Sequence, residues 1–281
     1  MHKKTQDTIR RTPRPQDLAS MSTQEQRDTF QISGLFAPGE LIAHFTDLDR
    51  LVVGGVVPAN KAIELPNHKE TGRAFFLERR ELGAINVGGP GKVNAGGQGF
   101  GLDHLDCIYL PMGTNHVSFE SADQAHPAKF YFLSCPAHSA HPLRVMKPAE
   151  AAPVKLGGQE TSNKRTIYKF IHQGGIQSCQ LVMGFTELEP GNVWNSFPPH
   201  VHWRRAEIYF YFDLGEKIVS HFYGEPQETR HLFLRNDEVA LSPNWSMHFG
   251  CGTGHYKFIW GMAGENQVFD DMDAVKPQDL R

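Results

Sequence analysis

The feature that most restricts the fold is a series of short apolar runs, rich in β-branched and aromatic residues and separated by glycine, proline or aspartate. Runs of this kind with tight turns are typical of all-β sandwiches and barrels. The 27 glycines and 18 prolines also favour many turns over long helices. The predicted strands are residues 41–45, 51–57, 73–77, 84–87, 107–110 and 130–133 in the first half, and 166–171, 180–185, 208–212, 218–222, 239–241 and 256–260 in the second.

Other segments depart from the strand pattern. Residues 18–32 mix polar with sparse apolar residues and are predicted to hold a short helix, as are residues near 148–151. Residues 136–165 contain four prolines and lose β character, as expected of a connection between two halves. The glycine clusters at 88–91 and 96–99 are predicted to be hairpin turns, because the first opens no helix and lacks the Lys-Ser/Thr pair of a phosphate loop.

Four residues with the chemistry of metal ligands occur in the second half. His200 and His202 are two residues apart, so in an extended strand their side chains point to the same face. Glu207 follows five residues after His202, and a turn between them would start a new strand with Glu207 facing inward. His248 follows a later apolar segment, five residues after Pro243. Together the four residues are predicted to form a three-histidine, one-carboxylate metal site inside a β-barrel.

The complete set of four is more specific than its parts. An isolated H-x-H pair in a chain with 15 histidines would more often be structural, but the full spacing is hard to reach by chance. The spacing resembles the two short motifs of the cupin superfamily. Three imidazoles and a carboxylate suit zinc, iron, manganese or nickel, and ligand type alone does not choose among them. The cation would act as a Lewis acid on a carbonyl or hydroxyl group.

The two halves contain a weak internal repeat. An arginine pair at 79–80 is matched 125 residues later by a pair at 204–205, and a histidine five residues past a proline recurs 132 residues apart, at His116 and His248. Such spacing is typical of a duplicated domain with small insertions. No histidines precede the first arginine pair, so the first copy is predicted to lack the metal site and His116 to be structural. The predicted division is a mobile N-terminal tail at 1–17, a first domain at 18–150 and a second domain at 151–281.

Charged residues of the second half are candidates for binding an anionic substrate. Arg165 and Arg230 are predicted to bind a carboxylate, because a planar guanidinium can hold one through two hydrogen bonds. Glu228 and His231 are predicted proton carriers. For each of the four, an ordinary solvated residue on the rim of a barrel is the alternative. The arginine pair at 204–205 recurs in the first half, which favours a structural or interface role.

Composition argues against several classes of protein. The formal net charge of −3 offers no basic surface for nucleic acid. The longest apolar run, residues 51–57, is far too short to cross a bilayer. Residues 1–15 are basic but contain no apolar segment, so no secretory signal is predicted. The four cysteines show no CxxC spacing and are predicted to be free thiols in a reducing cytoplasm.

Longer runs resemble one family in particular. Residues 76–83, 186–195, 224–231 and 259–273 are similar to the 5-keto-4-deoxyuronate isomerase family, the 4-deoxy-L-threo-5-hexosulose-uronate ketol-isomerases of pectin breakdown. The likeness extends from about residue 18 to residue 281. These runs are far more specific than the spacing of the four metal ligands.

The resemblance implies a mainly β fold of two tandem cupin-like barrels of the jelly-roll type, with a few short helices. It implies one Zn²⁺ per subunit, held by His200, His202, Glu207 and His248, and a homo-hexamer in the bacterial cytoplasm. The implied reaction converts 5-dehydro-4-deoxy-D-glucuronate, an aldehyde-bearing uronate, to the ketose 3-deoxy-D-glycero-2,5-hexodiulosonate. The expected partner is therefore this small-molecule substrate, with no nucleic acid and no membrane.

Two other functions stay open at this point. An iron-dependent bicupin dioxygenase uses the same ligand set with O₂, and it would be recognised by bound iron and oxygen uptake. A non-catalytic bicupin that binds or stores sugar would show unchanged activity after His200→Ala, because no chemistry would depend on the cation.

Overall fold

The computed structural model describes residues 9–281, which form four β-sheets and a few helical turns. The prediction of a mainly β fold is confirmed. The described residues divide into two compact units: an N-terminal unit of residues 9–10, 35–151 and 170–182, and a C-terminal unit of residues 11–34, 152–169 and 183–281. The predicted limits at 18–150 and 151–281 cut the chain once, whereas each compact unit includes a short segment from the opposite half of the chain.

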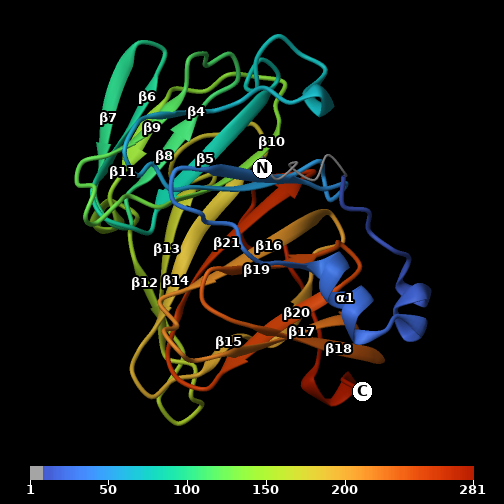
Figure 1. Ribbon diagram of the computed structural model, residues 1–281. Helices are drawn as coiled ribbons and strands as arrows, with labels where there is room; N and C mark the ends of the chain where they lie inside the picture. Colours follow the sequence, from blue (N-terminus) through green and yellow to red (C-terminus); the bar gives the residue numbers. More distant parts are fainter. Residues whose placement is uncertain (1–8) are drawn as a thin grey trace. The chain divides into compact units, whose positions relative to one another are not determined.

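The N-terminal unit contains two sheets (Figure 1). The six-stranded sheet has the order β11-β8-β5-β10-β3-β2 and the four-stranded sheet the order β4-β9-β6-β7. Phe119 of the smaller sheet packs against Phe130 and Phe132 of the larger one, so the core lies between the two sheets. The elements are β2 (Leu41–Phe45), β3 (Val52–Val56), β4 (Ile63–Glu64), η2 (Lys69–Thr71), β5 (Arg80–Asn86), β6 (Gly91–Ala95), β7 (Gln98–Leu102), β8 (Cys107–Leu110), β9 (Ser118–Ser121), β10 (Phe130–Pro136), β11 (Arg144–Met146) and η3 (Pro148–Glu150).

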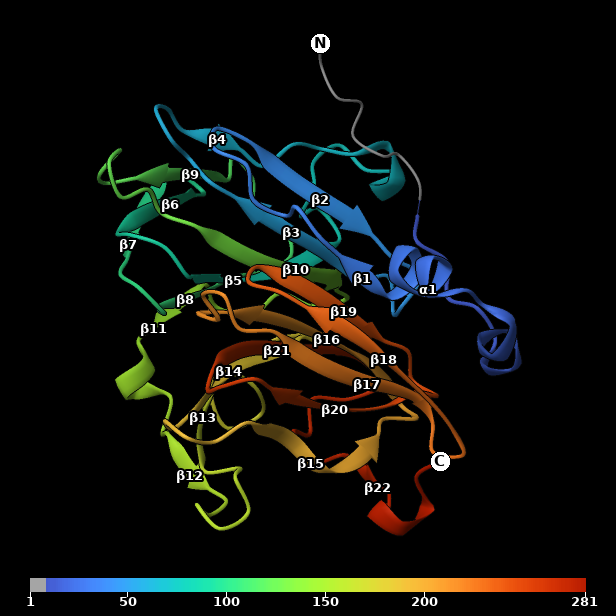
Figure 2. The ribbon, with the colours of Figure 1, turned by 60° about the horizontal axis from the view of Figure 1, so that its bottom comes forward.

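The sheets of the C-terminal unit have the orders β1-β19-β16-β21-β14-β13-β12 and β18-β17-β20-β15-β22. Figure 2 shows β16, β19 and β21 in one layer and β15, β17 and β20 in the other. All eight residues of β16 are buried, as expected of a central strand. The strands are β1 (Gln31–Ile32), β12 (Val154–Leu156), β13 (Arg165–Ile171), β14 (Val182–Leu188), β15 (Trp194–Val201), β16 (Arg205–Phe212), β17 (Val219–Glu225), β18 (Glu228–Leu234), β19 (Glu238–Ser242), β20 (Met247–Gly252), β21 (Lys257–Gly264) and β22 (Asp273–Ala274).

The strand order repeats between the two units. The run β8-β5-β10-β3-β2 corresponds to β19-β16-β21-β14-β13, and β4-β9-β6-β7 corresponds to β15-β20-β17-β18. β5 and β16 each begin at the second arginine of the repeated pair, Arg80 and Arg205. The internal repeat in the sequence is therefore also a repeat of topology.

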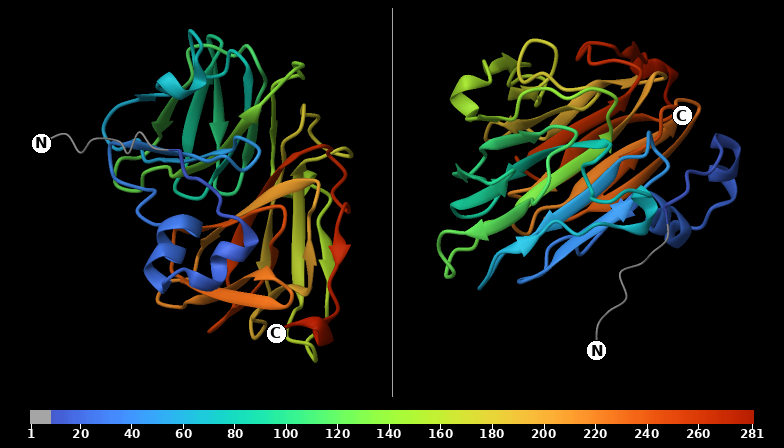
Figure 3. Two further views of the ribbon diagram at one scale, coloured as in Figure 1. Left: turned by 90° about the vertical axis from the view of Figure 1, so that its right-hand side faces the viewer. Right: turned by 90° about the horizontal axis from the view of Figure 1, so that it is seen from above.

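Helical structure gathers near the start of the described chain. The 3-10 helix η1 (Pro15–Ser20) precedes α1 (Thr23–Phe30), whose N-terminus is capped by reciprocal hydrogen bonds between Ser22 and Glu25. The short helix predicted within residues 18–32 is confirmed. Figure 3 shows these helices beside the strands of the C-terminal unit. The predicted mobile tail at 1–17 lies partly outside the described residues; within them, Arg10 bridges to Thr46.

The prediction of a strand at residues 73–77 is wrong. These residues form bends and the start of a turn, and β5 begins only at Arg80. Phe76 and Leu77 are nevertheless buried in the core. A buried apolar pair in a loop gives the same short signal as a strand, because periodicity does not separate such short runs. Each of the other predicted runs overlaps a strand.

Glycine makes one predicted hairpin turn possible. Gly96 and Gly97, between β6 and β7, have φ values of +56° and +81°, which residues with a side chain rarely adopt. The turn predicted at 96–99 is therefore confirmed there. Within residues 9–281, no helix has the length and apolar character needed to span a bilayer.

A buried carboxylate anchors a loop of the N-terminal unit. Glu81 is fully buried and accepts hydrogen bonds from the backbone N–H groups of Cys179, Gln180 and Leu181 at 2.7, 2.8 and 2.8 Å. The hydroxyl of Tyr109 donates to the same carboxylate at 2.7 Å. Because buried N–H groups are costly when unpaired, this single side chain fixes the loop ahead of β14.

Candidate metal centre and pocket

Neighbouring strands of the C-terminal unit bring the four predicted ligands together. His200 lies near the end of β15, His202 in the turn that follows, and Glu207 on β16. His248 lies on β20, opposite His200 in the antiparallel pair. His202 and Glu207 are five residues apart, so in one straight strand their side chains would point to opposite faces. The turn after β15 lets both face the cluster, as predicted from the sequence.

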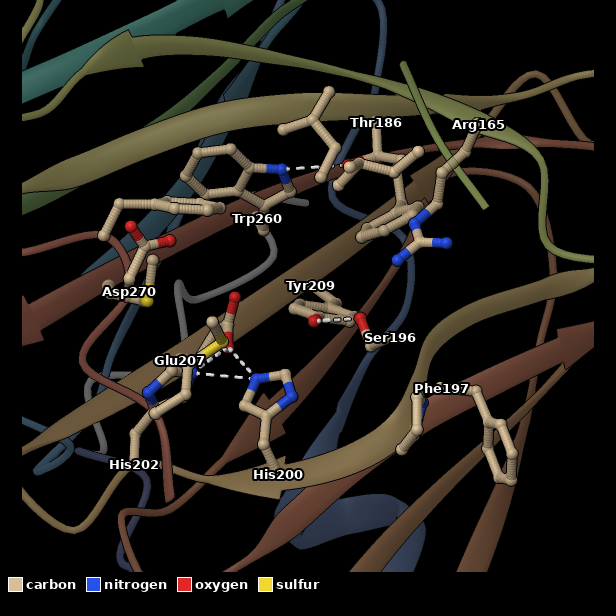
Figure 4. A pocket seen from close by; sticks show the side chains of 17 residues that line it. Arg165, Thr186, Ser196, Phe197, His200, His202, Glu207, Tyr209, Trp260 and Asp270 are labelled. Atoms are coloured by element: carbon tan, nitrogen blue, oxygen red, sulfur yellow. Dashed lines mark hydrogen bonds and ion pairs between the residues drawn. The ribbon is translucent and has the colours of Figure 1, made fainter. Parts of the chain in front are cut away.

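The ligand atoms of these four side chains converge. Nε2 of His202 is 2.9 Å from Oε2 of Glu207, and Nε2 of His248 is 2.6 Å from the same oxygen. Nε2 of His200 is 3.1 Å from Nε2 of His202. One ligand atom from each of the four residues lies within 4.8 Å of all the others. Figure 4 shows His200, His202 and Glu207 facing one another at the wall of a pocket.

The surroundings favour the protonation states that bind a cation. Burial works to raise the pKa of Glu207, but the adjacent imidazoles of His248 and His202 hold it well below its usual range. Burial lowers the pKa of His200 well below its usual range. At neutral pH the carboxylate is therefore ionised and the His200 ring is neutral, which are the forms that ligate metals.

The geometry of the cluster fits a divalent cation. Among the described residues, neither ring nitrogen of the buried His248 makes a hydrogen bond, although Nε2 closely approaches Glu207. Ligand atoms bound at about 2.1 Å in a tetrahedron would be about 3.4 Å apart. The distances from Oε2 of Glu207 to the three Nε2 atoms range from 2.6 to 3.9 Å. The cluster is therefore a possible metal-binding site.

The loop between β21 and β22 orients one of the histidines. Nδ1 of His202 is 2.8 Å from the backbone oxygen of Asp271, so Nδ1 carries the proton and Nε2 keeps its lone pair for a cation. We call residues 265–273 the closing segment, because several of its side chains line the pocket. Its backbone thus contacts the cluster from outside.

The guanidinium of Arg205 holds the closing segment in place. Nη1 donates to the carbonyl oxygen of Val268 at 2.6 Å, and Nη2 donates to those of Phe269 and Asp271 at 2.9 and 3.2 Å. Arg205 is only 1% exposed. Since Asp271 also accepts from His202, the position of Arg205 affects the orientation of a candidate ligand.

Replacing Arg205 with lysine is expected to weaken cation binding roughly tenfold, because loss of such outer hydrogen bonds typically costs 10- to 100-fold in affinity. A single ammonium group cannot reproduce three hydrogen bonds made by a planar fork. The affinity for Zn²⁺ would be measured by competition with a chelator. Arg79→Lys, at an exposed arginine of the repeated pair, is the matched control. Equal affinities in the two variants would contradict this role.

A pocket of about 270 Å³ opens beside the cluster. Arg165, at the start of β13, lies on one side of it, with Nη1 donating to the backbone oxygen of Asn163 at 2.8 Å (Figure 4). The hydroxyl of Tyr209 is 2.7 Å from Oγ of Ser196. The lining residues are Leu156, Arg165, Ile167, Thr186, Ser196, Phe197, Pro198, His200, His202, Glu207, Tyr209, Phe258, Trp260, Met262, Phe269, Asp270 and Met272.

The other predicted site residues lie elsewhere. The other three candidates lie on β18, the edge strand of its sheet, and none of them lines the pocket: Arg230, Glu228 and His231. Arg230 and Glu228 form an ion pair with each other. The short segment at 224–231 resembles the isomerase family, but that likeness did not show which way its side chains point. Of the two predicted carboxylate-binding arginines, only Arg165 lies at the pocket beside the cluster.

Sequence reasoning missed several pocket residues. Thr186, Ser196 and Asp270 line the pocket but follow no recognisable spacing. Tyr209 is two residues after Glu207, so in β16 both side chains lie on the same face. This alternation indicated from the sequence that Tyr209 faces inward. The closing segment contributes from a loop, where periodicity carries no information.

The four converging side chains and the paired sheets define a cupin-like protein. A solved IolB-like protein from Salmonella typhimurium is similar, with a TM-score of 0.70 at 15% identity over 88% of this chain and 96% of that one. Oxalate decarboxylase from Lactobacillus farciminis is similar at a TM-score of 0.57 and 12% identity, over 87% and 89% of the two chains. These likenesses concern the fold.

The chain belongs to the KduI/IolB family, whose model matches residues 41–276. It is 51% identical to the 4-deoxy-L-threo-5-hexosulose-uronate ketol-isomerase of Opitutus terrae, over 96% of this chain and 98% of that protein. It is 48% identical to the protein of the same name in Halalkalibacterium halodurans, over 95% and 97% of the two chains. The family resemblance stated from the sequence is confirmed.

Proposed function

We propose that this protein is a ketol-isomerase that converts 5-dehydro-4-deoxy-D-glucuronate to 3-deoxy-D-glycero-2,5-hexodiulosonate in pectin breakdown. The relatives that are about half identical over nearly the whole chain support this substrate. The observation that carries the proposal is the cluster of three imidazoles and one carboxylate beside a pocket that also contains an arginine. A uronate needs both features: a cationic group for its carboxylate and a site for its reacting oxygens.

Part of the proposal concerns the cation. His200, His202, Glu207 and His248 would hold one Zn²⁺ per subunit, and when bound it would stabilise the negative charge that develops on the substrate oxygens. The ligand set also suits iron or manganese, so zinc rests on the family resemblance. A homo-hexamer in the bacterial cytoplasm is proposed on the same ground.

The chain's own residues would fix the substrate at its carboxylate end. Within residues 9–281 the guanidinium of Arg165 makes one hydrogen bond, to the backbone oxygen of Asn163, and its other N–H groups remain for a bidentate contact with the carboxylate. Phe197, Phe258 and Trp260 add apolar walls. These walls reduce the number of waters that compete for the substrate's oxygens.

The reaction moves a carbonyl from C1 to C2. A proton must leave C2, the electron pair of that bond must form a double bond between C1 and C2, and the C1 oxygen must take the negative charge. Return of a proton to C1, with transfer of the C2 hydroxyl proton to the C1 oxygen, gives the ketose. Because a proton next to a carbonyl is only weakly acidic, a site that accepts developing oxyanion charge is needed.

The test of the proposed function combines metal analysis with an assay. The purified protein should convert the unsaturated-galacturonate breakdown product to its 2-ketose isomer, and it should contain about one equivalent of divalent metal per chain. If the protein contains iron and consumes oxygen, its function is that of a dioxygenase and the isomerase proposal is wrong. Conversion that continues unchanged after His200→Ala would show that the cluster has no part in the chemistry.

Replacing Arg165 with alanine is expected to raise KM about 10- to 100-fold with a smaller change in kcat, because hydrogen bonds to a charged group contribute about 1.5–3 kcal/mol. Steady-state kinetics on the deoxy-ketouronate measure this. Arg230→Ala is the matched control, since Arg230 lies outside the pocket. An unchanged KM for the Arg165 variant would remove the proposed carboxylate contact.

A further inference from the structure

The proposed reaction needs a group that removes a proton from carbon, and the metal cluster does not supply one. Among the described residues that line the pocket, the ionisable side chains are Arg165, His200, His202, Glu207, Tyr209 and Asp270. His200, His202 and Glu207 face one another within the cluster. If they hold the cation, their lone pairs are committed to it.

Two of the remaining three groups are poor bases. Arg165 is a cation with no acceptor atom. Tyr209 is 2% exposed and its hydroxyl is 2.7 Å from Oγ of Ser196, and a phenol ordinarily keeps its proton at neutral pH. A base must be able to accept a proton near neutral pH. That leaves Asp270.

Asp270 differs from the other aspartates of the closing segment. Asp271 and Asp273 both pair with the guanidinium of Arg204, which lowers the pKa of Asp271 to about 2. The carboxylate of Asp270 makes no hydrogen bond or ion pair with any residue in the described part of the chain, and it lines the pocket. Figure 4 shows it on the side of the pocket opposite Arg165.

The backbone on both sides of Asp270 is fixed. Arg205 donates to the carbonyl oxygens of Val268 and Phe269 before it and of Asp271 after it. The N–H of Met272 donates to the carbonyl oxygen of Asp270 itself at 2.9 Å. Because the backbone on both sides is held, the carboxylate of Asp270 occupies a defined place at the pocket, and its oxygens stay available to a substrate.

We propose that Asp270 is the base that transfers the proton between C2 and C1, an inference that rests on the proposed isomerase function. With the substrate carboxylate at Arg165, the aldehyde end extends toward the side of the pocket where Asp270 lies. The carboxylate of Asp270 takes the proton from C2, and the electron pair of that bond moves to C1–C2 as the C1 carbonyl becomes an oxyanion. The protonated Asp270 then delivers its proton to C1, while the C2 hydroxyl gives its proton to the C1 oxyanion, so that C2 becomes the new carbonyl and C1 carries the new hydroxyl. No oxidant or reductant is consumed.

The test compares Asp270→Asn with the wild type and with Glu265→Gln. Glu265 is an exposed acid of the same segment that does not line the pocket, so its variant repeats the loss of charge without the proposed loss of the base. For Asp270→Asn we expect kcat to fall about a hundredfold in both directions, the lower end for general acid–base catalysis. KM and bound metal per chain should stay within about threefold of the wild type, as should all values for Glu265→Gln.

Solvent deuterium gives a readout that is independent of the rate. Since Asp270 is exposed, a proton on its carboxylate exchanges with water, and wild-type turnover in D₂O should place deuterium at C1 of the ketose. Product without deuterium, or Asp270→Asn with kcat within threefold of the wild type, would overturn the proposal while leaving the isomerase function intact. A wild-type protein that does not convert the substrate would remove the function, and this inference with it.

Discussion

Replacing His248 with alanine is expected to lower kcat/KM at least about a thousandfold, or ~4 kcal/mol, because the cation that stabilises the developing oxyanion would be lost. His248 closes the cluster from β20 and lies 2.6 Å from the carboxylate of Glu207. With this ring removed, only two imidazoles and one carboxylate would remain, and we expect these three groups to release the cation. The measurements are bound metal by elemental analysis and turnover of the deoxy-ketouronate.

The repeat in the chain provides a matched control for this experiment. His116 occupies the corresponding position of the first copy, five residues past a proline, but it is exposed and lies outside the cluster. His116→Ala should therefore keep both metal and activity. Far-UV circular dichroism should be the same for the two variants, since His248 contributes to the cluster rather than to the apolar core. Full turnover by metal-free His248→Ala would end the argument for a metal centre.

Replacing Glu81 with alanine is expected to reduce the free energy of unfolding by about 4 kcal/mol, because it leaves the backbone N–H groups of three successive residues without their acceptor. For a chain of this size the melting temperature should fall by roughly 10 °C. Differential scanning calorimetry measures the change. The melting temperature of Glu81→Gln should lie between those of the wild type and the alanine variant. The amide keeps one acceptor oxygen, but its NH₂ group would face backbone N–H groups, which are also donors.

An exposed strand carboxylate serves as the control for that variant. Glu64 lies on β4 in the same unit and is exposed, so Glu64→Ala should change the free energy of unfolding by less than about 0.5 kcal/mol. If Glu81→Ala melted within one or two degrees of Glu64→Ala, the loop at 179–181 would not depend on the buried carboxylate.

Much of the fold could be predicted from the sequence because a buried strand requires a short run of apolar residues, which is visible locally in the chain. Residues 208–212 of β16 are all aliphatic or aromatic, as is typical of a central strand buried on both faces, and the strand was predicted from that run. Residues 73–77 show a similar apolar run but form a loop. Phe76 and Leu77 are buried in the core without belonging to a sheet. Strands such as β18, with alternating exposed positions, left too weak a signal.

Some residues of the site could be predicted from the sequence, whereas others needed the tertiary structure. His200, His202 and Glu207 are near one another in the chain, so their spacing through one turn carried the prediction, and His248 was added from its position five residues after Pro243 at the end of a later apolar segment. Arg165 and Arg230 were equal candidates from sequence. Only the strand order separates them, because β13 passes beside the pocket whereas β18 does not contribute to it.

The sequence by itself determined the class of fold, the internal repeat and the four side chains of the cluster, because each depends on spacings of a few residues or on a repeat within one chain. Only the tertiary structure decided how the closing segment lies against the pocket. There Arg205 donates to carbonyl oxygens of this segment, and the carboxylate of Asp270 has no hydrogen-bond partner in the part of the chain that the structure describes. Those contacts join residues about 60 positions apart through a loop, and no periodicity in the chain records which side such a loop presents.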